Sequence, residues 1–115
     1  MVTYMQLYRI LEYRDAEGQS PFERWFDGLD AQAATKINVA LTRLAQGNVS
    51  NVKGVGGGVF EFRVDLGPGY RIYFGRDGHD LVILLGGGTK RRQQQDIDSA
   101  FARWMDYKTR KKKAR

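Results

Sequence analysis

The hydrophobic pattern begins with an expected strand and a helical hairpin. Residues 4–14 are rich in aromatic and branched side chains and end at a turn-prone stretch, which predicts an opening strand. A capping box begins at Ser20, with proline at the first helical position, and the apolar residues that follow recur at helical intervals. Asp30 caps a second expected helix, which ends at Gly47.

After a glycine- and asparagine-rich connection over residues 48–58, the period of the apolar positions changes from helical to two. Residues 60–66 and 70–74 flank a Gly-Pro-Gly turn, which predicts a hairpin. An Asp-Gly turn leads into residues 81–85, whose unbroken apolar run suits a central strand, and three glycines end that strand. From about Gln93 the spacing predicts a last, amphipathic helix.

These elements predict one α+β domain over residues 1–107, with the order β-α-α-β-β-β-α, followed by a basic and disordered tail over residues 108–115. The expected sheet is small and antiparallel, with about four strands, an N-terminal helical hairpin and a C-terminal helix. Helices packed on one face of this sheet would leave its other face available to a partner. The longest apolar run is far too short to span a membrane.

Composition narrows the classes of function. The net charge is +6, but the tail holds six of the 19 basic residues and no acidic one, so residues 1–107 carry 13 of each sign. Residues 53–92 still hold seven basic against four acidic residues, and this excess falls on the expected sheet. Without cysteine there is no disulfide, and without clustered histidines or carboxylates we expect no metal and no cofactor. The absence of a secretion signal predicts a cytoplasmic protein.

A polar cluster is expected on the central hairpin. If residues 67–69 form a three-residue loop, Asp65 lies opposite Arg71 and Arg63 lies opposite Tyr73. Because side chains alternate along each strand, one face then carries the candidate catalytic residues Glu61, Arg63, Arg71 and Tyr73.

Such a cluster has the groups that metal-independent RNA cleavage requires. Glu61 would accept the proton of the ribose 2′-hydroxyl, and Arg63 and Arg71 would stabilise the oxyanion at phosphorus. Tyr73 would stack a base or relay a proton. Alternatively, these side chains only solvate an exposed sheet face, with Asp65 and Arg71 as an ordinary cross-strand pair.

Two glycine-rich segments have the wrong form for nucleotide sites. Residues 86–90 (GGGTK) do not have the residue order of a P-loop, and residues 54–58 precede a strand and therefore form no dinucleotide fingerprint. Flexible amides in the first segment would hold an RNA phosphate, or the segment is a simple strand-to-helix turn. The candidate RNA-binding residues are Lys53, Lys90, Arg91 and Arg92.

Three strings together resemble the RelE/ParE superfamily of bacterial toxins, in its phage-derived, HigB-like "addiction module killer protein" branch. They are Lys53 with the glycines after it, VFEFRVDLGPGYRIYF from Val59, and LLGGGTK from Leu84. The resemblance extends through Tyr107. It implies the toxin of a type II toxin–antitoxin system, a helix-turn-helix antitoxin as partner, and an endoribonuclease that cleaves mRNA on the ribosome.

Carried over to this sequence, the resemblance makes Arg71 the residue that stabilises the scissile phosphate. Arg63 occupies the basic position of the preceding strand, and Lys90 or Arg91 the basic position after the last strand.

The sequence departs from many RNA-cleaving relatives over residues 91–98, which contain neither histidine nor tyrosine. Glu61 or Tyr73 would then have to supply the acid and base, or the chain binds RNA without cutting it. Two alternatives stay open: a ParE-like inhibitor of DNA gyrase, and a phage accessory module that binds RNA through its basic tail.

Overall fold

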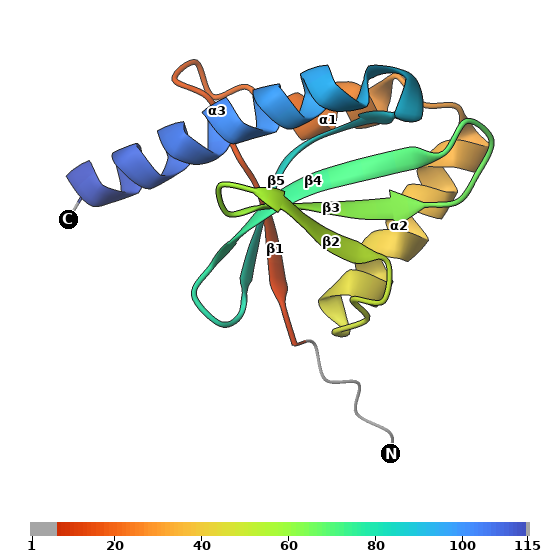
Figure 1. Cartoon of the computed structure of the whole chain (residues 1–115), viewed down its shortest axis with the longest axis horizontal. Coiled ribbons are helices and arrows are strands. Elements are labelled where there is room, and N and C mark those ends of the chain that lie inside the picture. Colours follow the sequence, from red (N-terminus) through yellow and green to blue (C-terminus); the bar gives the residue numbers. More distant parts are fainter. Residues whose placement is uncertain (1–6, 115) are drawn as a thin grey trace.

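The computed structural model describes residues 7–114, and within them the chain forms three α-helices and one five-stranded sheet (Figure 1). The strands are β1 (Arg9–Glu12), β2 (Val52–Gly56), β3 (Val59–Val64), β4 (Tyr70–Asp77) and β5 (Leu81–Thr89). The helices are α1 (Pro21–Asp27), α2 (Ala31–Ala45) and α3 (Gln93–Lys113), and a short 3-10 helix, η1 (Lys90–Arg92), leads into α3. The α+β class is confirmed.

The sheet has the order β1-β5-β4-β3-β2, and it is mixed because β1 runs parallel to β5 while the other pairs are antiparallel. The expected antiparallel sheet of about four strands is therefore wrong in strand number and direction. The additional strand is β2, which lies in the glycine-rich segment interpreted as a connection. The expected first strand over residues 4–14 is found at β1, and its residues 4–6 lie outside the described residues.

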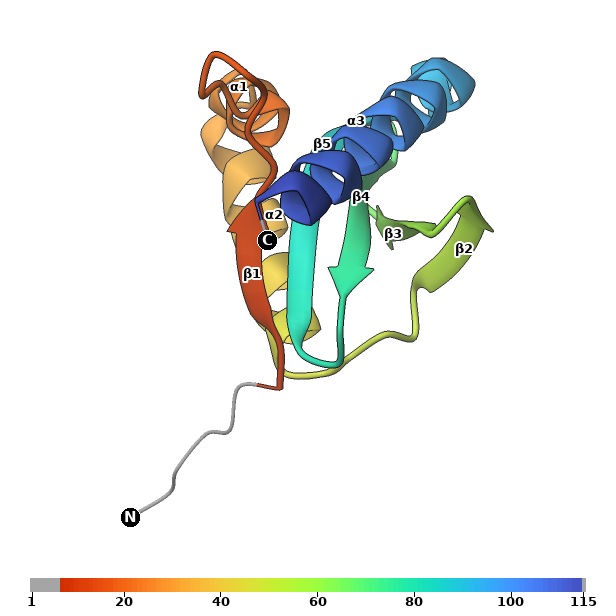
Figure 2. The ribbon, with the colours of Figure 1, turned by 90° about the vertical axis from the view of Figure 1, so that its left-hand side faces the viewer.

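Helices cover both faces of the sheet, so the expectation of one open face is wrong. Figure 2 shows α1 and α2 on one side of the strands and α3 on the other. Two hydrophobic cores result, because residues on β3 and β4 alternate between the faces. The core under α1 and α2 includes Phe22, Ile37, Leu44, Phe62, Ile72 and Phe74. The core under α3 includes Val59, Tyr73, Ile83, Leu85, Ala100 and Trp104.

The three glycines of residues 86–88 lie inside β5 instead of ending it. Each leaves room for a bulky or charged side chain from a covering helix, because a Cβ at Gly87 would lie 2.3 Å from the ring of Trp25, and one at Gly88 would lie 1.9 Å from the carboxylate of Asp96. The glycines serve close packing, and the expected strand-to-helix turn is wrong.

The expectation of a disordered tail is also wrong for residues 108–113, which continue α3. Basic side chains suit the negative end of a helix. Lys111 additionally reaches from the last turns of α3 to Asp77 on β4, with 2.5 Å between Nζ and Oδ1. Among the described residues, no helix has the length and apolar character that a membrane crossing requires.

Both predicted helix N-caps are present. The Ser20 hydroxyl accepts a hydrogen bond from the backbone N–H of Glu23 at 3.0 Å, and the Asp30 carboxylate accepts one from the N–H of Ala33 at 2.8 Å.

Asp30→Ala is expected to lower the free energy of unfolding by about 1 kcal/mol, because it leaves an N–H of the first turn without its partner. Urea unfolding would measure the loss. Asp27→Ala, which removes a carboxylate from the last turn of α1, should cause no loss.

Candidate functional site

The candidate site lies on the face of the sheet that α3 covers, near the first turn of that helix. In the observed register of β3 and β4, Glu61 lies opposite Tyr73, and Arg63 lies opposite Arg71. The expected pairing of Asp65 with Arg71 is therefore wrong, because five residues, and not three, separate the two strands. The observed register is shifted from the expected one by two residues. Because side chains alternate along a strand, the four candidate catalytic residues still share one face.

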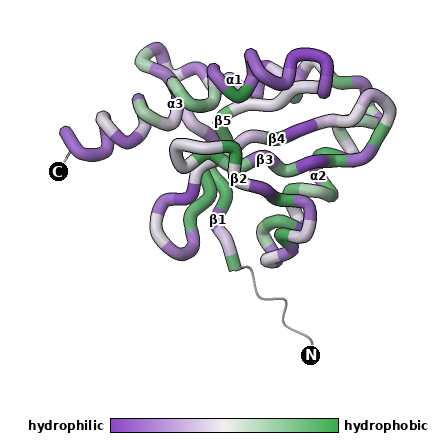
Figure 3. Tube along the Cα trace, in the orientation of Figure 1, coloured by the Kyte–Doolittle hydropathy of each residue, from purple (hydrophilic) through white to green (hydrophobic). Residues whose placement is uncertain are grey.

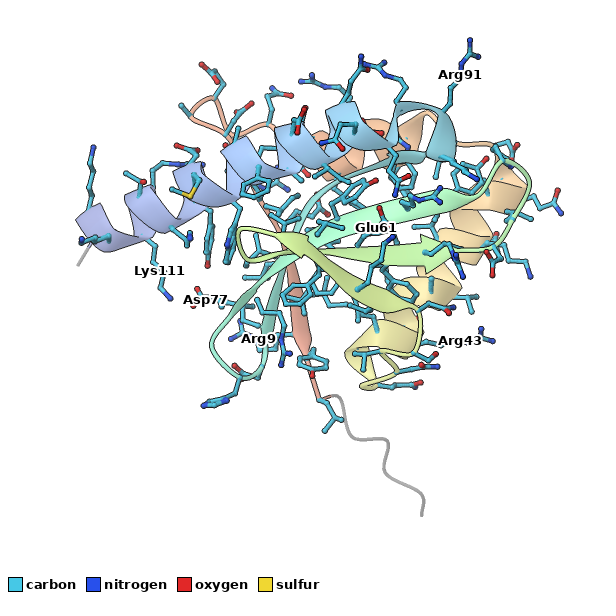
Figure 4. All side chains as sticks on the ribbon, in the orientation of Figure 1. Arg9, Arg43, Glu61, Asp77, Arg91 and Lys111 are labelled. Atoms are coloured by element: carbon cyan, nitrogen blue, oxygen red, sulfur yellow. The ribbon has the colours of Figure 1, made fainter. Side chains whose placement is uncertain are left out.

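Glu61 is the centre of this cluster, with 2% of its area exposed. Figure 4 shows it between the sheet and the start of α3. Its Oε1 lies 3.6 Å from Lys53 Nζ and 3.6 Å from Arg71 Nε, and its Oε2 accepts a hydrogen bond of 2.8 Å from Gln93 Nε2. A buried carboxylate is stable only when it is paired in this way, so Glu61 fixes the positions of two cations.

Arg71 is largely covered but lies among polar groups, with 9% of its side chain exposed. Its Nη1 donates a hydrogen bond to the Gly69 carbonyl at 3.2 Å, while its buried Nε makes no hydrogen bond within the described part of the chain. The guanidinium is therefore held rigidly between Glu61 and the turn after β3, with unused capacity to donate.

Tyr73 is fully buried, and its hydroxyl makes no hydrogen bond with any described residue. Burial raises the pKa of this phenol far above its ordinary value, and the negative charge of Glu61 raises it further. The phenol therefore stays protonated at neutral pH. The predicted roles of Tyr73 in stacking a base, and of Glu61 in accepting a proton, both require contact with RNA, which these covered side chains do not offer.

The solvent-facing cations of the cluster are Lys53 and Arg63, whose side chains are 66% and 56% exposed. Lys53 lies opposite Glu61 on β2, and Arg63 lies opposite Arg71 on β3. Arg63 pairs with Asp65, with 3.6 Å between Nε and Oδ1. The structure thus brings together three cations from three adjacent strands, and two of them, Lys53 and Arg71, pair with Glu61.

The cations of η1 are less closely grouped with the others. Lys90 follows the end of β5, whose last residue lies opposite Tyr70, next to Arg71. Arg92 is exposed and donates a hydrogen bond to Gln95 at 2.9 Å. Of the predicted RNA-binding residues, Lys53 belongs to the cluster, and Lys90 and Arg92 lie on the adjoining η1 turn. Arg91 lies on the same turn but points away from the sheet in Figure 4.

Gln93 and Asp96 belong to the site, although neither was predicted. Both lie on the inner side of the first turn of α3, where the helical spacing of residues 93, 96, 97 and 100 could have indicated them. Burial raises the pKa of Asp96, while the charges of Arg92 and Arg103 oppose that rise. The Asp96 carboxylate covers the backbone of Gly88. The predicted phosphate cradle of glycine amides is therefore wrong at Gly88, since a carboxylate occupies its place.

The arrangement can bind an anion and stabilise negative charge. The exposed Lys53 and Arg63 and the largely covered Arg71 lie on the same face as a carboxylate that is itself hidden from solvent, so a phosphate group meets positive charge first. Among residues 7–114, no group of three or more histidine, aspartate or glutamate side chains could hold a metal ion.

Comparison with known proteins places the site within a described family. The family model described as "Phage derived protein Gp49-like (DUF891)" matches residues 24–105, which include every candidate site residue. A protein of Haemophilus influenzae (strain Rd), described only as an uncharacterized protein, is 44% identical over 80 residues. That match covers 69% of this chain and 81% of the relative.

Proposed function

The chain belongs to the family of Gp49-like phage-derived proteins, and from this premise we propose that it is the toxin of a type II toxin–antitoxin module and a ribosome-dependent endoribonuclease. The observation that carries the proposal is the group of cations on one face of the sheet, in which Lys53 and Arg71 pair with the buried Glu61 and Arg63 lies opposite Arg71. The resemblance of the central hairpin to RelE/ParE toxins supports the same reading. A co-encoded antitoxin is the expected partner.

In the proposed reaction, the ribose 2′-hydroxyl oxygen attacks the neighbouring phosphorus and the bond to the 5′-oxygen breaks. The products are a 2′,3′-cyclic phosphate and a 5′-hydroxyl. Arg63 meets the oxyanion from the solvent side, and Arg71, whose side chain is still 9% exposed, supplies a fixed charge beside it. A preorganised cation is most effective where negative charge develops. Glu61 acts as a positioning residue, since its carboxylate fixes Arg71 and Lys53.

Proton transfer is assigned to Lys53 instead of Glu61 or Tyr73. Its ammonium faces solvent and lies on the same face as Arg71, so it can donate a proton to the leaving 5′-oxygen. The proton of the 2′-hydroxyl passes to solvent. No step requires a metal or a cofactor.

Primer extension on a message translated in a purified system tests the proposal. New 5′ ends should appear when the purified protein is added, and they should be absent when ribosomes are omitted. An intact message together with a loss of DNA supercoiling would instead identify a gyrase inhibitor. An intact message with unchanged supercoiling and no growth arrest would leave only a nucleic-acid-binding module.

A further inference from the structure

The last turns of α3 form a second cationic surface, far from the candidate site. We call it the terminal basic surface, and it consists of Lys108, Arg110, Lys111, Lys112 and Lys113. Every residue from 108 to 114 is exposed, and the last core residue of the helix is Trp104. Figure 1 shows this end of α3 projecting past the sheet. Most of it is hydrophilic in Figure 3.

The charges on this surface are only partly compensated. Lys111 pairs with Asp77, and Arg110 pairs with Asp106 at 2.8 Å. Lys112 and Lys113 make no ion pair with any described residue.

Adjacent cations also repel one another within the helix. Lys108 and Lys112 are four residues apart, a spacing at which like charges destabilise a helix. The helix dipole offsets part of that cost, but it acts only on the last turn. A polyanion bound at this surface would relieve that repulsion.

A hollow of about 290 Å³ beside this surface offers a place for an anionic group. It is bordered by Tyr107, Lys108 and Lys112 on α3 and by part of Arg76 on β4, whose guanidinium donates a hydrogen bond to the Tyr8 hydroxyl at 3.2 Å. The ring of Tyr107 stacks on that of Trp104, which also lines the hollow, with centroids 5.3 Å apart, so these two lining residues are packed against each other. Asp77 also lines the hollow but is held by Lys111 and by the hydroxyl of Tyr107.

We propose that the terminal basic surface binds the sugar-phosphate backbone of a folded RNA, separately from the candidate site. The two sites are about 28 Å apart along α3, from Gln93 to Lys112, at 1.5 Å per residue. One RNA segment at each site is therefore compatible with the geometry. The surface adds to the proposed function, since a ribosome-dependent enzyme must hold ribosomal RNA as well as message, but binding at this surface does not require cleavage.

The composition of the surface favours a nucleic acid over a protein or a membrane. Four of its five cations are lysines, which are depleted in protein interfaces but serve as point charges for phosphates. Residues 108–113 contain no apolar side chain, so this segment has no face to insert into a lipid surface.

The test is a titration of a labelled double-stranded RNA hairpin with the full chain at several salt concentrations. Lys112→Gln/Lys113→Gln should weaken binding at low salt and make the slope of log K against log salt shallower by about 1 to 2, because each lost phosphate contact releases about one counterion fewer. The matched control is Arg9→Gln/Arg24→Gln, which removes the same charge from exposed positions on β1 and α1.

The outcomes are distinct. A shallower slope for the lysine variant alone supports the proposal. Equal changes in both variants would mean that only net charge matters, and an unchanged slope would exclude this surface; either result overturns the proposal. If the lysine variant bound RNA as tightly as the unchanged protein but no longer bound an acidic protein or anionic vesicles, the proposal would be overturned in favour of that partner. Arg71→Gln should keep most of the slope of log K against log salt for the RNA hairpin. Loss of cleavage can therefore be distinguished from loss of RNA binding at the terminal basic surface.

Discussion

Replacing Arg71 with glutamine is expected to slow cleavage of translated mRNA by about 10²- to 10³-fold, the usual consequence of losing one preorganised group that stabilises an oxyanion. Arg71 is held between Glu61 and the Gly69 carbonyl, so its charge is fixed before the substrate arrives. Glutamine keeps a hydrogen-bond donor beside Glu61 but supplies no charge. The rate of appearance of new 5′ ends in the translation system measures the effect, and growth arrest should weaken in parallel.

Stability has to be separated from activity in this experiment, because the substitution leaves the buried Glu61 with one cation fewer. Urea unfolding of Arg71→Gln measures that cost. The double variant Glu61→Gln/Arg71→Gln removes both charges and should recover stability without recovering cleavage. Recovery of cleavage by the double variant would assign the defect to folding. Arg9→Gln, an exposed arginine on β1 at the other edge of the sheet, should cleave normally.

Local features of the sequence predicted most of the elements, because the responsible contacts are short in range. The caps at Ser20 and Asp30 depend on groups three residues apart. The periods of the apolar positions located the helical hairpin, the central hairpin and the strand over residues 81–85.

The glycine-rich segments were misinterpreted, because the reason for several of their glycines lies in a distant residue. At Gly57 a Cβ would lie 1.8 Å from the ring of Phe101 on α3, which nothing in the neighbouring sequence indicates. A local signal was present nonetheless. Gly57 and Gly58 both have positive φ, at 59° and 86°, and a Gly-Gly pair between two strands is typical of a two-residue hairpin turn. That signal would have identified β2.

The candidate site was predictable in its membership but not in its burial. Side-chain alternation placed Glu61, Arg63, Arg71 and Tyr73 on one face even though the register was wrong by two residues. Whether that face is open depends on where α3 packs, which is a long-range property. Because α3 covers it, Glu61 and Tyr73 are buried and only Lys53 and Arg63 face solvent.

The packing of α3 on the sheet leads to the second large effect, which is expected for Gly75→Ala. A Cβ at Gly75 would lie 2.4 to 2.6 Å from three ring carbons of Trp104, which is itself buried in the core under α3. The added methyl group must displace that ring, and overpacking of this kind costs about 1 to 3 kcal/mol of unfolding free energy. Urea unfolding measures the loss, and the fluorescence of Trp104 should change with its surroundings.

The matched control is Gly54→Ala, because Gly54 is also a strand glycine without positive φ, and its Cβ would only touch Phe60 at 4.0 Å. At such a position alanine is neutral or slightly stabilising, since it restricts the unfolded chain. The difference between the two variants therefore isolates the contact with Trp104. If the two variants were equally stable, α3 would not lie against β4 as described. The conclusion that α3 covers Glu61 and Tyr73 would then be wrong as well.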